Sequence, residues 1–255
     1  MIKSNGQIPT PVISAAEAED ERVRAVYADR RRTIPKQRYA RTDPFTQCSS
    51  HEREEKMAAL FRKEGLTSLA GLKILDVGCG RGDTLRQLLE YGANPELLTG
   101  IDLLDENIGD AQRLAPHIPV ICGSACRLPF PDEHFDLVIQ FMLFTSVLDC
   151  EVKALIAREM NRVLVPGGRV LWYDFTFDNP KNANVRGIPK REIQKLFPGF
   201  RMKAKRITLA PPLGRIIAPL SAVLYYCLSR VRPLCTHLLC LLQKSSEKAR
   251  SGGKP

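Results

Sequence analysis

The sequence predicts an α/β fold in which a parallel β-sheet carries helices on both faces. Between residues 73 and 175, short apolar segments of strand length alternate with segments of helical periodicity, a pattern typical of βαβ units. The chain has 255 residues, of which 44% are hydrophobic and 26% charged. This length suits one large α/β domain or a domain with a cap, and the composition excludes disordered and fibrous classes.

The first 66 residues are predicted to form a leader and a helical cap. Residues 1–14 contain one Lys and no apolar segment of the signal-peptide type, so we expect a flexible leader without a signal peptide. A charged helix is predicted over residues 15–32. Its apolar side chains recur on one face, at Val23, Val26 and Tyr27.

A second helix is predicted in the same region. Ser49 precedes Glu52 by three residues, which is the spacing of a capping box, so we expect the helix to begin there. Gly65 is expected to end it. The apolar residues that this helix would bury are Met57, Leu60 and Phe61.

Residues 67–178 are predicted to form the core of the domain. The apolar segments predict strands over residues 73–77, 98–102, 117–122, 135–140 and 169–175. Helical spacing predicts helices through Leu85, Leu88 and Leu89 to Gly92, over residues 106–114, and over residues 150–164. The Pro-Gly-Gly sequence at 166–168 is expected to separate the last helix from the strand that follows it.

Residues 179–255 are predicted to complete the sheet with strands over 201–209 and 237–243. Between them, apolar residues follow the spacing of an amphipathic helix, at Leu220, Val223, Leu224, Cys227, Leu228 and Val231. We expect this helix to pack in the core between the last two strands. The alternative is an apolar lid that faces a membrane, with Tyr225, Tyr226, Arg230 and Arg232 at the interface.

The net charge of +10 is distributed unevenly along the chain. Residues 1–70 carry +3, residues 71–180 carry −7, and residues 181–255 carry +14. A basic excess is typical of proteins that bind nucleic acid or an anionic membrane surface. Because the basic excess lies in the tail, we expect it to attract an anionic acceptor or a membrane surface rather than to bind in a groove of a nucleic acid.

The eight Cys residues form no Cys-x-x-Cys pair and lie mostly in apolar runs. We therefore expect buried thiols in a reduced, cytoplasmic protein, with peripheral membrane contact as an open alternative. The His residues are scattered and no His/Cys cluster has metal-ligand spacing, so no metal is predicted. The nearly apolar run 216–228 is shorter than the ~20 residues of a spanning helix.

The sequence LDVGCGRG, residues 75–82, joins the first predicted strand to its helix. Glycines at 78, 80 and 82 permit a tight turn and a close approach of the backbone to a ligand. Asp76 at the strand end can accept hydrogen bonds from this loop or from an ammonium group. A dinucleotide-binding loop would need a third glycine at position 83, where this chain has Asp, so a nicotinamide cofactor is disfavoured.

A second acidic residue, Asp102, ends the next predicted strand. A carboxylate there can accept hydrogen bonds from both hydroxyls of a ribose, although an Asp at a strand end also serves commonly as a helix cap. The segment 123–136 then connects two strands through a loop that could lie against an adenine ring.

These segments together resemble the class I S-adenosylmethionine-dependent methyltransferases related to ubiquinone and menaquinone C-methyltransferases. The resemblance covers residues 72–174 and rests on LDVGCGRG, GID, GSACRLPFPDEHFDLV and REMNRVLVPGGRVLWYD. It implies a Rossmann-like sheet of seven strands, mostly parallel with an antiparallel last strand. The tail resembles, more loosely, uncharacterised bacterial methyltransferases of glycan or natural-product pathways, through WYDFTFDNP, NVRGIPKREI and TLAPPLGRIIAPL.

The resemblance also implies which residues bind S-adenosyl-L-methionine. Those expected near its methionine part and sulfonium group are Asp76, Gly78, Cys79, Gly80, Gln140 and Phe141. Asp102 is expected at the ribose, and Leu103, Ser124 and Ala125 at the adenine. Ser124 stands where the family usually has an Asp, so the contact with the adenine amino group is expected to be weaker or to come from another group.

Candidate residues for the acceptor side are fewer. Asp174, at the end of the fifth predicted strand, is the candidate general base, since ligands in such sheets bind beyond the strand ends; a structural carboxylate that caps the following loop is the alternative. The residues expected near the acceptor are Tyr39, Phe144, Thr145 and Arg186. For Arg186, pairing with a carboxylate or phosphate competes with a solvated surface charge.

The expected function is methyl transfer to a small-molecule, sugar-linked or lipid-linked acceptor, with oxygen favoured over carbon or nitrogen. A catalytically silent cofactor-binding protein is one alternative. An RNA or DNA methyltransferase is another, motivated by the basic tail. Enzymes that methylate exocyclic amines of bases usually carry an Asn/Asp-Pro-Pro-aromatic motif after the fourth strand, where this chain reads Gln-Phe-Met-Leu at 140–143.

Overall fold

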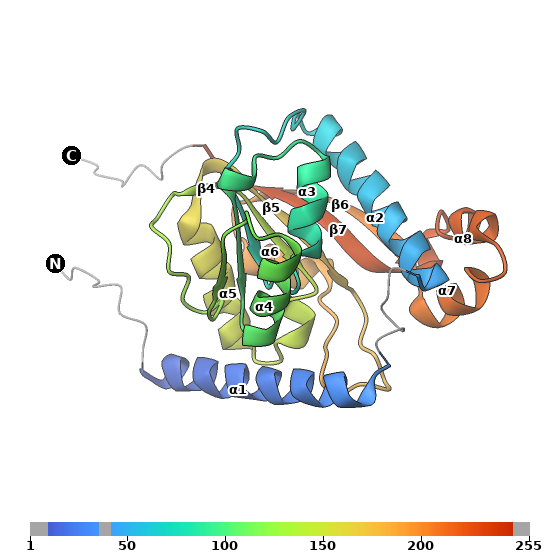
Figure 1. Ribbon diagram of the computed structural model, residues 1–255, viewed down its shortest axis with the longest axis horizontal. Helices are drawn as coiled ribbons and strands as arrows, with labels where there is room; N and C mark the ends of the chain where they lie inside the picture. Colours follow the sequence, from blue (N-terminus) through green and yellow to red (C-terminus); the bar gives the residue numbers. More distant parts are fainter. Residues whose placement is uncertain (1–9, 36–41, 247–255) are drawn as a thin grey trace.

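Figure 1 shows a computed structural model of the chain, which describes residues 10–35 and 42–246. Within these ranges seven strands form one sheet in the order β3-β2-β1-β4-β5-β7-β6. The strands are β1 (Ile74–Val77), β2 (Leu98–Asp102), β3 (Val120–Cys122), β4 (Phe135–Phe141), β5 (Leu164–Phe175), β6 (Arg201–Leu209) and β7 (Cys235–Gln243). All neighbouring pairs are parallel except those of β7, which runs antiparallel to β5 and β6. The predicted sheet is confirmed.

Helices cover both faces of this sheet. They are α1 (Thr10–Thr33), α2 (Pro44–Lys63), α3 (Asp83–Glu90), α4 (Asp105–Leu114), α5 (Cys150–Val163), α6 (Lys190–Leu196), α7 (Pro211–Ile217) and α8 (Ala222–Leu228). One apolar core joins the sheet to α2, α3 and α4, and the other joins it to α5 and α6. Side chains alternate between the two cores along a strand, so the parallel strands are apolar on both faces.

Two N-terminal predictions were wrong in their boundaries. Helix α1 begins at Thr10, so residues 10–14 belong to a helix and not to the leader. Helix α2 begins at Pro44 and not at the Ser49 capping box. Asp43 caps it, because its carboxylate accepts a hydrogen bond from the backbone N–H of Thr46 at 2.8 Å, and proline suits the first helical position, where its missing N–H has no partner to lose. The predicted helix end at Gly65 is confirmed.

The Pro-Gly-Gly sequence at 166–168 does not separate a helix from a strand. Strand β5 begins at Leu164, directly after α5. Phe135 pairs with Leu164 and Leu137 pairs with Arg169, so the extra residues of β5 form a bulge inside the strand. Smaller differences affect β3, which begins at Val120, and β7, which begins at Cys235.

The tail has two short helices, α7 and α8, between β6 and β7. Only α8 lies within the helix predicted through Leu220 and Val231, and α7 was not predicted. Pro219 lies between them and has no N–H to continue the helical hydrogen bonds. Leu220 and Val223 are 76% and 74% exposed, whereas Tyr225 is fully buried. The prediction that this segment packs in the core is therefore wrong for most of its apolar side chains.

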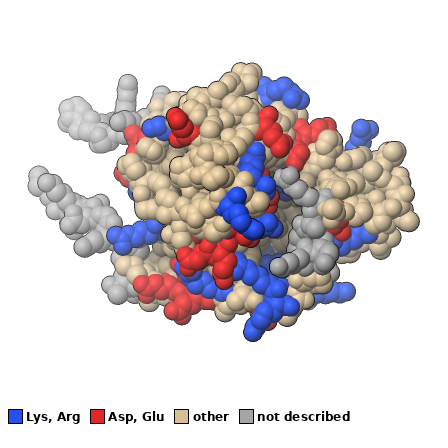
Figure 2. Space-filling model, viewed as in Figure 1, with Lys and Arg blue, Asp and Glu red and all other residues tan. Residues whose placement is uncertain are grey.

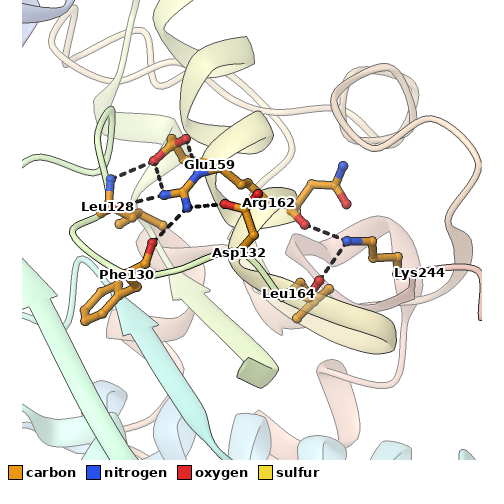
Figure 3. A network of polar contacts seen from close by, with 8 residues as sticks. Leu128, Phe130, Asp132, Glu159, Arg162, Leu164 and Lys244 are labelled. Carbon is orange, nitrogen blue, oxygen red and sulfur yellow. Dashed lines mark hydrogen bonds and ion pairs between the residues drawn. The ribbon is translucent and has the colours of Figure 1, made fainter. Parts of the chain in front are cut away.

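Arg162 on α5 ties the loop before β4 to this helix (Figure 3). Its guanidinium donates to the Leu128 carbonyl at 2.9 Å and to the Phe130 carbonyl at 2.8 Å. It also pairs with Asp132 at 2.8 Å and with Glu159 at 2.7 Å, and Glu159 accepts from the Leu128 N–H at 2.8 Å. Lys244, after β7, donates to two carbonyls at the end of α5 and joins the same region to the tail.

We expect Arg162→Lys to lower the free energy of unfolding by about 1–3 kcal/mol, because a lysine cannot reproduce the planar fork of donors. Urea unfolding followed by circular dichroism measures this change. Arg158→Lys is the matched control, since Arg158 is exposed on the same helix. An equal loss in both variants would contradict the importance of the network.

Candidate functional site

A pocket lies at the carboxyl ends of β1, β2 and β4. The sequence-predicted residues that line it are Gly78, Gly80, Asp102, Leu103, Ala125 and Phe141. Three further predicted residues, Asp76, Cys79 and Gln140, are buried beside it, and Ser124 precedes Ala125. The structure therefore brings the predicted cofactor residues to one edge of the sheet.

The loop after β1 has the conformation that its glycines permit. Gly78, Gly80 and Gly82 have φ angles of 75°, 54° and 73°, in the left-handed region that other residues rarely adopt. The N–H groups of Gly78 and Cys79 both donate to the Ile101 carbonyl, at 2.8 and 3.0 Å. These bonds hold the loop against β2 and leave its backbone facing the pocket.

Asp102 connects three segments around the pocket. One carboxylate oxygen accepts from the Gly80 N–H at 2.8 Å. The other accepts from the Leu104 N–H at 3.0 Å and from the Asn107 side-chain amide at 2.9 Å. Asn107 also lines the pocket and was not predicted, since a lone Asn on a helix has no distinctive signal in the sequence.

Asp76 is a buried carboxyl group with an incomplete set of partners. It is 1% exposed, and its Oδ2 has no hydrogen-bond partner among the described residues. Burial and the neighbouring Asp102 carboxylate raise the pKa of Asp76 to about 8, and Arg53 opposes this effect. A cationic ligand beside Asp76 would stabilise its ionised form.

Asp174 lies at the carboxyl end of β5 and is also fully buried. Burial raises its pKa to about 7, and a hydrogen bond from the Thr145 hydroxyl at 2.8 Å opposes this. Its Oδ2 has no partner among the described residues. The Gln140 side chain lies close to Asp174 and also lowers the pKa of Asp174. Its amide nitrogen nevertheless has no hydrogen bond of normal geometry to any described residue. Asp174 is thus poised to change protonation near neutral pH.

The segment after β4 turns sharply over the glycine loop. Met142 has a φ of 64°, which is strained for a side chain of this kind, and its N–H donates to the Tyr173 carbonyl at 2.8 Å. This turn places the Leu143 side chain against Gly78, where an added Cβ would lie 3.3 Å from it. Strained residues of this type cluster at functional sites.

The candidate acceptor residues occupy different places. Thr145 is buried and supports Asp174, whereas Phe144 is fully buried in the core, where its ring centroid lies 4.4 Å from that of Trp172. Arg186 is exposed and does not line the pocket. Tyr39 lies outside the described residues. The positions of Phe144 and Arg186 do not support a contact of either side chain with an acceptor.

Helix α1, which belongs to the helical cap predicted for residues 1–66, closes the pocket from outside the sheet. Its residues Glu19, Asp20, Val23 and Tyr27 line the pocket, and in Figure 1 the helix runs along one side of the domain beside α4 and α5. Glu19 accepts from the Leu148 N–H, and Arg22 donates to the Ser146 carbonyl. The Tyr27 hydroxyl lies 3.1 Å from the Ser146 hydroxyl. These contacts hold α1 against the segment between β4 and α5.

Asp20 lies on helix α1, and its carboxyl group is next to the Ser124 side chain. Burial raises its pKa, and a hydrogen bond with the Ser124 side chain opposes the effect. The Ser124 hydroxyl in turn accepts from the Cys126 N–H at 3.1 Å. The chain therefore has a carboxyl group beside Ser124 although the loop itself lacks the Asp expected there.

Arg53 on α2 lies over the rings of Phe141 and Tyr173, at 5.2 and 5.4 Å from their centroids. Its Nε is buried and has no hydrogen-bond partner among the described residues. His237 stacks on Tyr173, and burial, with Arg53 nearby, lowers its pKa to about 3, so it is neutral. Within the described ranges, His, Cys, Asp and Glu form no group of three or more that could hold a metal ion.

Residues 74–168 match the family model of a methyltransferase domain. A tRNA N(3)-cytidine methyltransferase of Gallus gallus is 31% identical over 117 residues, 42% of this chain and 31% of the relative. A demethylmenaquinone methyltransferase of Staphylococcus aureus is 36% identical over 104 residues, 40% of this chain and 42% of the relative. The matches thus span less than half of these curated relatives.

Solved structures are similar over a larger part of the chain. The structure of a putative sarcosine dimethylglycine methyltransferase from Galdieria sulphuraria superposes with a TM-score of 0.58 at 16% identity. The superposition covers 77% of this chain and 86% of that chain. At this level of identity the likeness shows the fold.

We expect Glu19→Gln to loosen helix α1, because the amide is a weaker partner for both Arg22 and the Leu148 N–H. Hydrogen exchange with mass spectrometry should show α1 amides exchanging several-fold faster, with the exchange of β4 and β5 unchanged. Glu17→Gln is the control, since Glu17 is exposed on the same helix. Unchanged exchange of α1 in Glu19→Gln would show that other contacts hold the helix.

Proposed function

We propose that this chain, which carries a class I methyltransferase domain, transfers a methyl group from S-adenosyl-L-methionine to a hydroxyl group of a small-molecule, sugar-linked or lipid-linked acceptor. The observation that carries the proposal is the pocket formed by the glycine loop and the fixed Asp102 carboxylate. Beside it lies the buried Asp76 carboxyl group, whose Oδ2 has no hydrogen-bond partner among the described residues. These groups suit a cationic nucleoside ligand better than a pyrophosphate, which the Asp83 and Asp102 carboxylates would repel.

The residues present fit S-adenosyl-L-methionine. Asp102 would accept hydrogen bonds from the ribose hydroxyls, since a carboxylate has about four acceptor positions and three are occupied. Asp76 with Gly78 and Gly80 would hold the methionine part, where the ammonium group satisfies the buried carboxylate. Leu103 and Ala125 would flank the adenine, and Asp20 would take the place of the acidic residue that Ser124 replaces.

When bound, this cofactor supplies a methyl group activated by a sulfonium, and the protein supplies alignment and a site without bulk water. Gln140 and Phe141 would lie beside the sulfonium region. Helix α1 would cover the cofactor, because its residues already form the outer wall of the pocket. The net charge of −7 on residues 71–180 favours a cationic ligand over an anionic one.

Asp174 would accept the proton of the acceptor hydroxyl. Its pKa of about 7 leaves a substantial fraction ionised at neutral pH, and the Thr145 hydroxyl orients the carboxylate. Arg53 lies over the rings of Phe141 and Tyr173 near the ends of β4 and β5, and its Nε has no hydrogen-bond partner in the part of the chain that the structure describes. It would attract an anionic or strongly polar group of the acceptor. Because Asp174 is placed to accept a hydroxyl proton, oxygen is the favoured target atom.

Binding of S-adenosylhomocysteine, measured by isothermal titration calorimetry, tests the cofactor proposal. We expect Asp102→Asn to weaken binding by roughly 10- to 100-fold, because it replaces charge-assisted hydrogen bonds of about 1.5–3 kcal/mol with weaker ones. Glu90→Gln, at an exposed position on α3, is the control. Absence of binding by a folded wild type, or full binding by Asp102→Asn, would contradict the proposal.

Transfer of radiolabelled methyl groups into fractions of a cell extract, with mass spectrometry of the product, tests the acceptor class. At saturating cofactor we expect labelling of a lipid or glycan fraction at a rate that rises with pH through about 7, where Asp174 loses its proton. Asp174→Asn should lower the rate by about 10²–10⁴-fold and remove this rise. Label found in RNA alone, or a rate that falls as the pH passes 7, would overturn this part of the proposal.

A further inference from the structure

The segment between β6 and β7 forms a projection with an apolar outer surface, here called the apolar lobe (α7, α8 and residues 218–232). Its large apolar side chains with more than 40% exposure are Ile216, Leu220, Val223, Leu224 and Val231. In Figure 1 the lobe extends beyond the end of the sheet, and Figure 2 shows its visible face almost free of charged side chains. Contiguous exposed apolar surface of this kind marks an interaction site.

The inner side of the lobe is firmly anchored. The rings of Phe45 and Tyr225 pack edge to face with centroids 6.2 Å apart, and the buried Tyr225 hydroxyl donates to Glu52 at 3.1 Å. Gly214 lets α7 approach α2 so closely that an added Cβ would lie 2.3 Å from the Phe45 ring. The exposed side chains are therefore held on the outside by a packed interior and do not result from a loose segment.

The charged residues of the lobe and of the two strands that flank it have one sign. No Asp or Glu occurs from residue 193 to residue 246, a stretch that contains nine Lys and Arg residues. Arg230 and Arg232 are exposed on the lobe itself. Where the lobe meets the rest of the molecule, Figure 2 shows charges of both signs, and Arg215 of the lobe pairs with Asp43 at 3.5 Å. An apolar surface whose own exposed charges are basic is complementary to anionic head groups above an acyl layer.

We propose that the apolar lobe docks this protein on the surface of an anionic lipid bilayer, with Leu220, Val223 and Leu224 inserted at the level of the head groups and Arg230 and Arg232 against lipid phosphates. A second copy of the chain fits less well. In a two-fold interface this patch would face itself and bring arginines together with no carboxylate from the lobe to pair them. None of the described helices is both long and apolar enough to cross a bilayer, so contact is at the surface.

The apolar lobe lies at the same edge of the sheet as Asp174, so docking on a bilayer would bring the membrane close to the candidate site. His237, near the start of β7, pairs with Phe175 at the end of β5, directly after Asp174. The lobe precedes β7 and so lies at the carboxyl end of β5, the same edge as Asp174. A bilayer that contacts the lobe would bring a lipid-linked acceptor to this edge, but docking itself does not require methyl transfer.

Flotation of the full chain with vesicles tests the proposal. We expect binding to vesicles of phosphatidylcholine with 30% phosphatidylglycerol, weak binding to phosphatidylcholine alone, and release by salt. Leu220→Ser/Val223→Ser should weaken binding at least about tenfold by removing the inserted apolar groups. Ile13→Ser/Phe177→Ser, at exposed apolar positions outside the lobe, should bind as the wild type does.

A second pair of variants separates charge from insertion. Arg230→Gln/Arg232→Gln should weaken binding roughly fivefold for each arginine and reduce its salt dependence. Binding of S-adenosylhomocysteine by each variant distinguishes loss of docking from loss of the pocket. The proposal is overturned if anionic vesicles do not bind the wild type, if the serine variant binds equally well, or if light scattering shows a dimer that the serine variant abolishes.

Discussion

The position of the Asp102 carboxylate is the constraint on which the pocket depends. It accepts one hydrogen bond from the glycine loop and two from the start of α4, at Leu104 and Asn107, so one side chain at the end of β2 sets the spacing of these two segments. Those segments meet because β1 and β2 are parallel neighbours whose carboxyl ends lie at one edge of the sheet. The glycine loop can approach this carboxylate because its three glycines have left-handed backbone angles.

Two further carboxyl groups are buried at the same edge, and burial affects both in the same direction. The pKa of Asp76 is raised to about 8 and that of Asp174 to about 7. For Asp76, the nearby Asp102 carboxylate adds to the effect, because two neighbouring carboxylates in a dry site repel each other. A cation bound between them would relieve this repulsion, which links the charge of the proposed cofactor to the protonation of the protein.

The acidic pocket and the basic tail have separate physical roles. The pocket concentrates negative charge where a cationic ligand is proposed, whereas the tail has no acidic residue over the two last strands and the lobe between them. The antiparallel strand β7 brings these regions together, since it returns from the lobe to pair along β5 beside Asp174. A protein with this arrangement can hold a cationic cofactor and an anionic surface at neighbouring places.

The alternation of strands and helices, the parallel core and the glycine loop with Asp76 and Asp102 were predictable from local patterns in the sequence: apolar runs at strand length, helical spacing, and glycine where the backbone must turn. The seven-stranded sheet with its antiparallel last strand was implied by the resemblance to a known family. Other features were not predictable in this way. Glu19 and Tyr27 of α1 line the pocket, Asp20 lies beside Ser124, and Arg53 lies over Phe141. The apolar lobe is exposed although its spacing predicted a core helix. These facts depend on contacts between residues far apart in the chain, and amphipathic spacing indicates an apolar face without indicating what covers it. The sequence by itself determined the fold and the pocket loop, and only the tertiary structure decided which distant side chains close the site and which apolar face remains open.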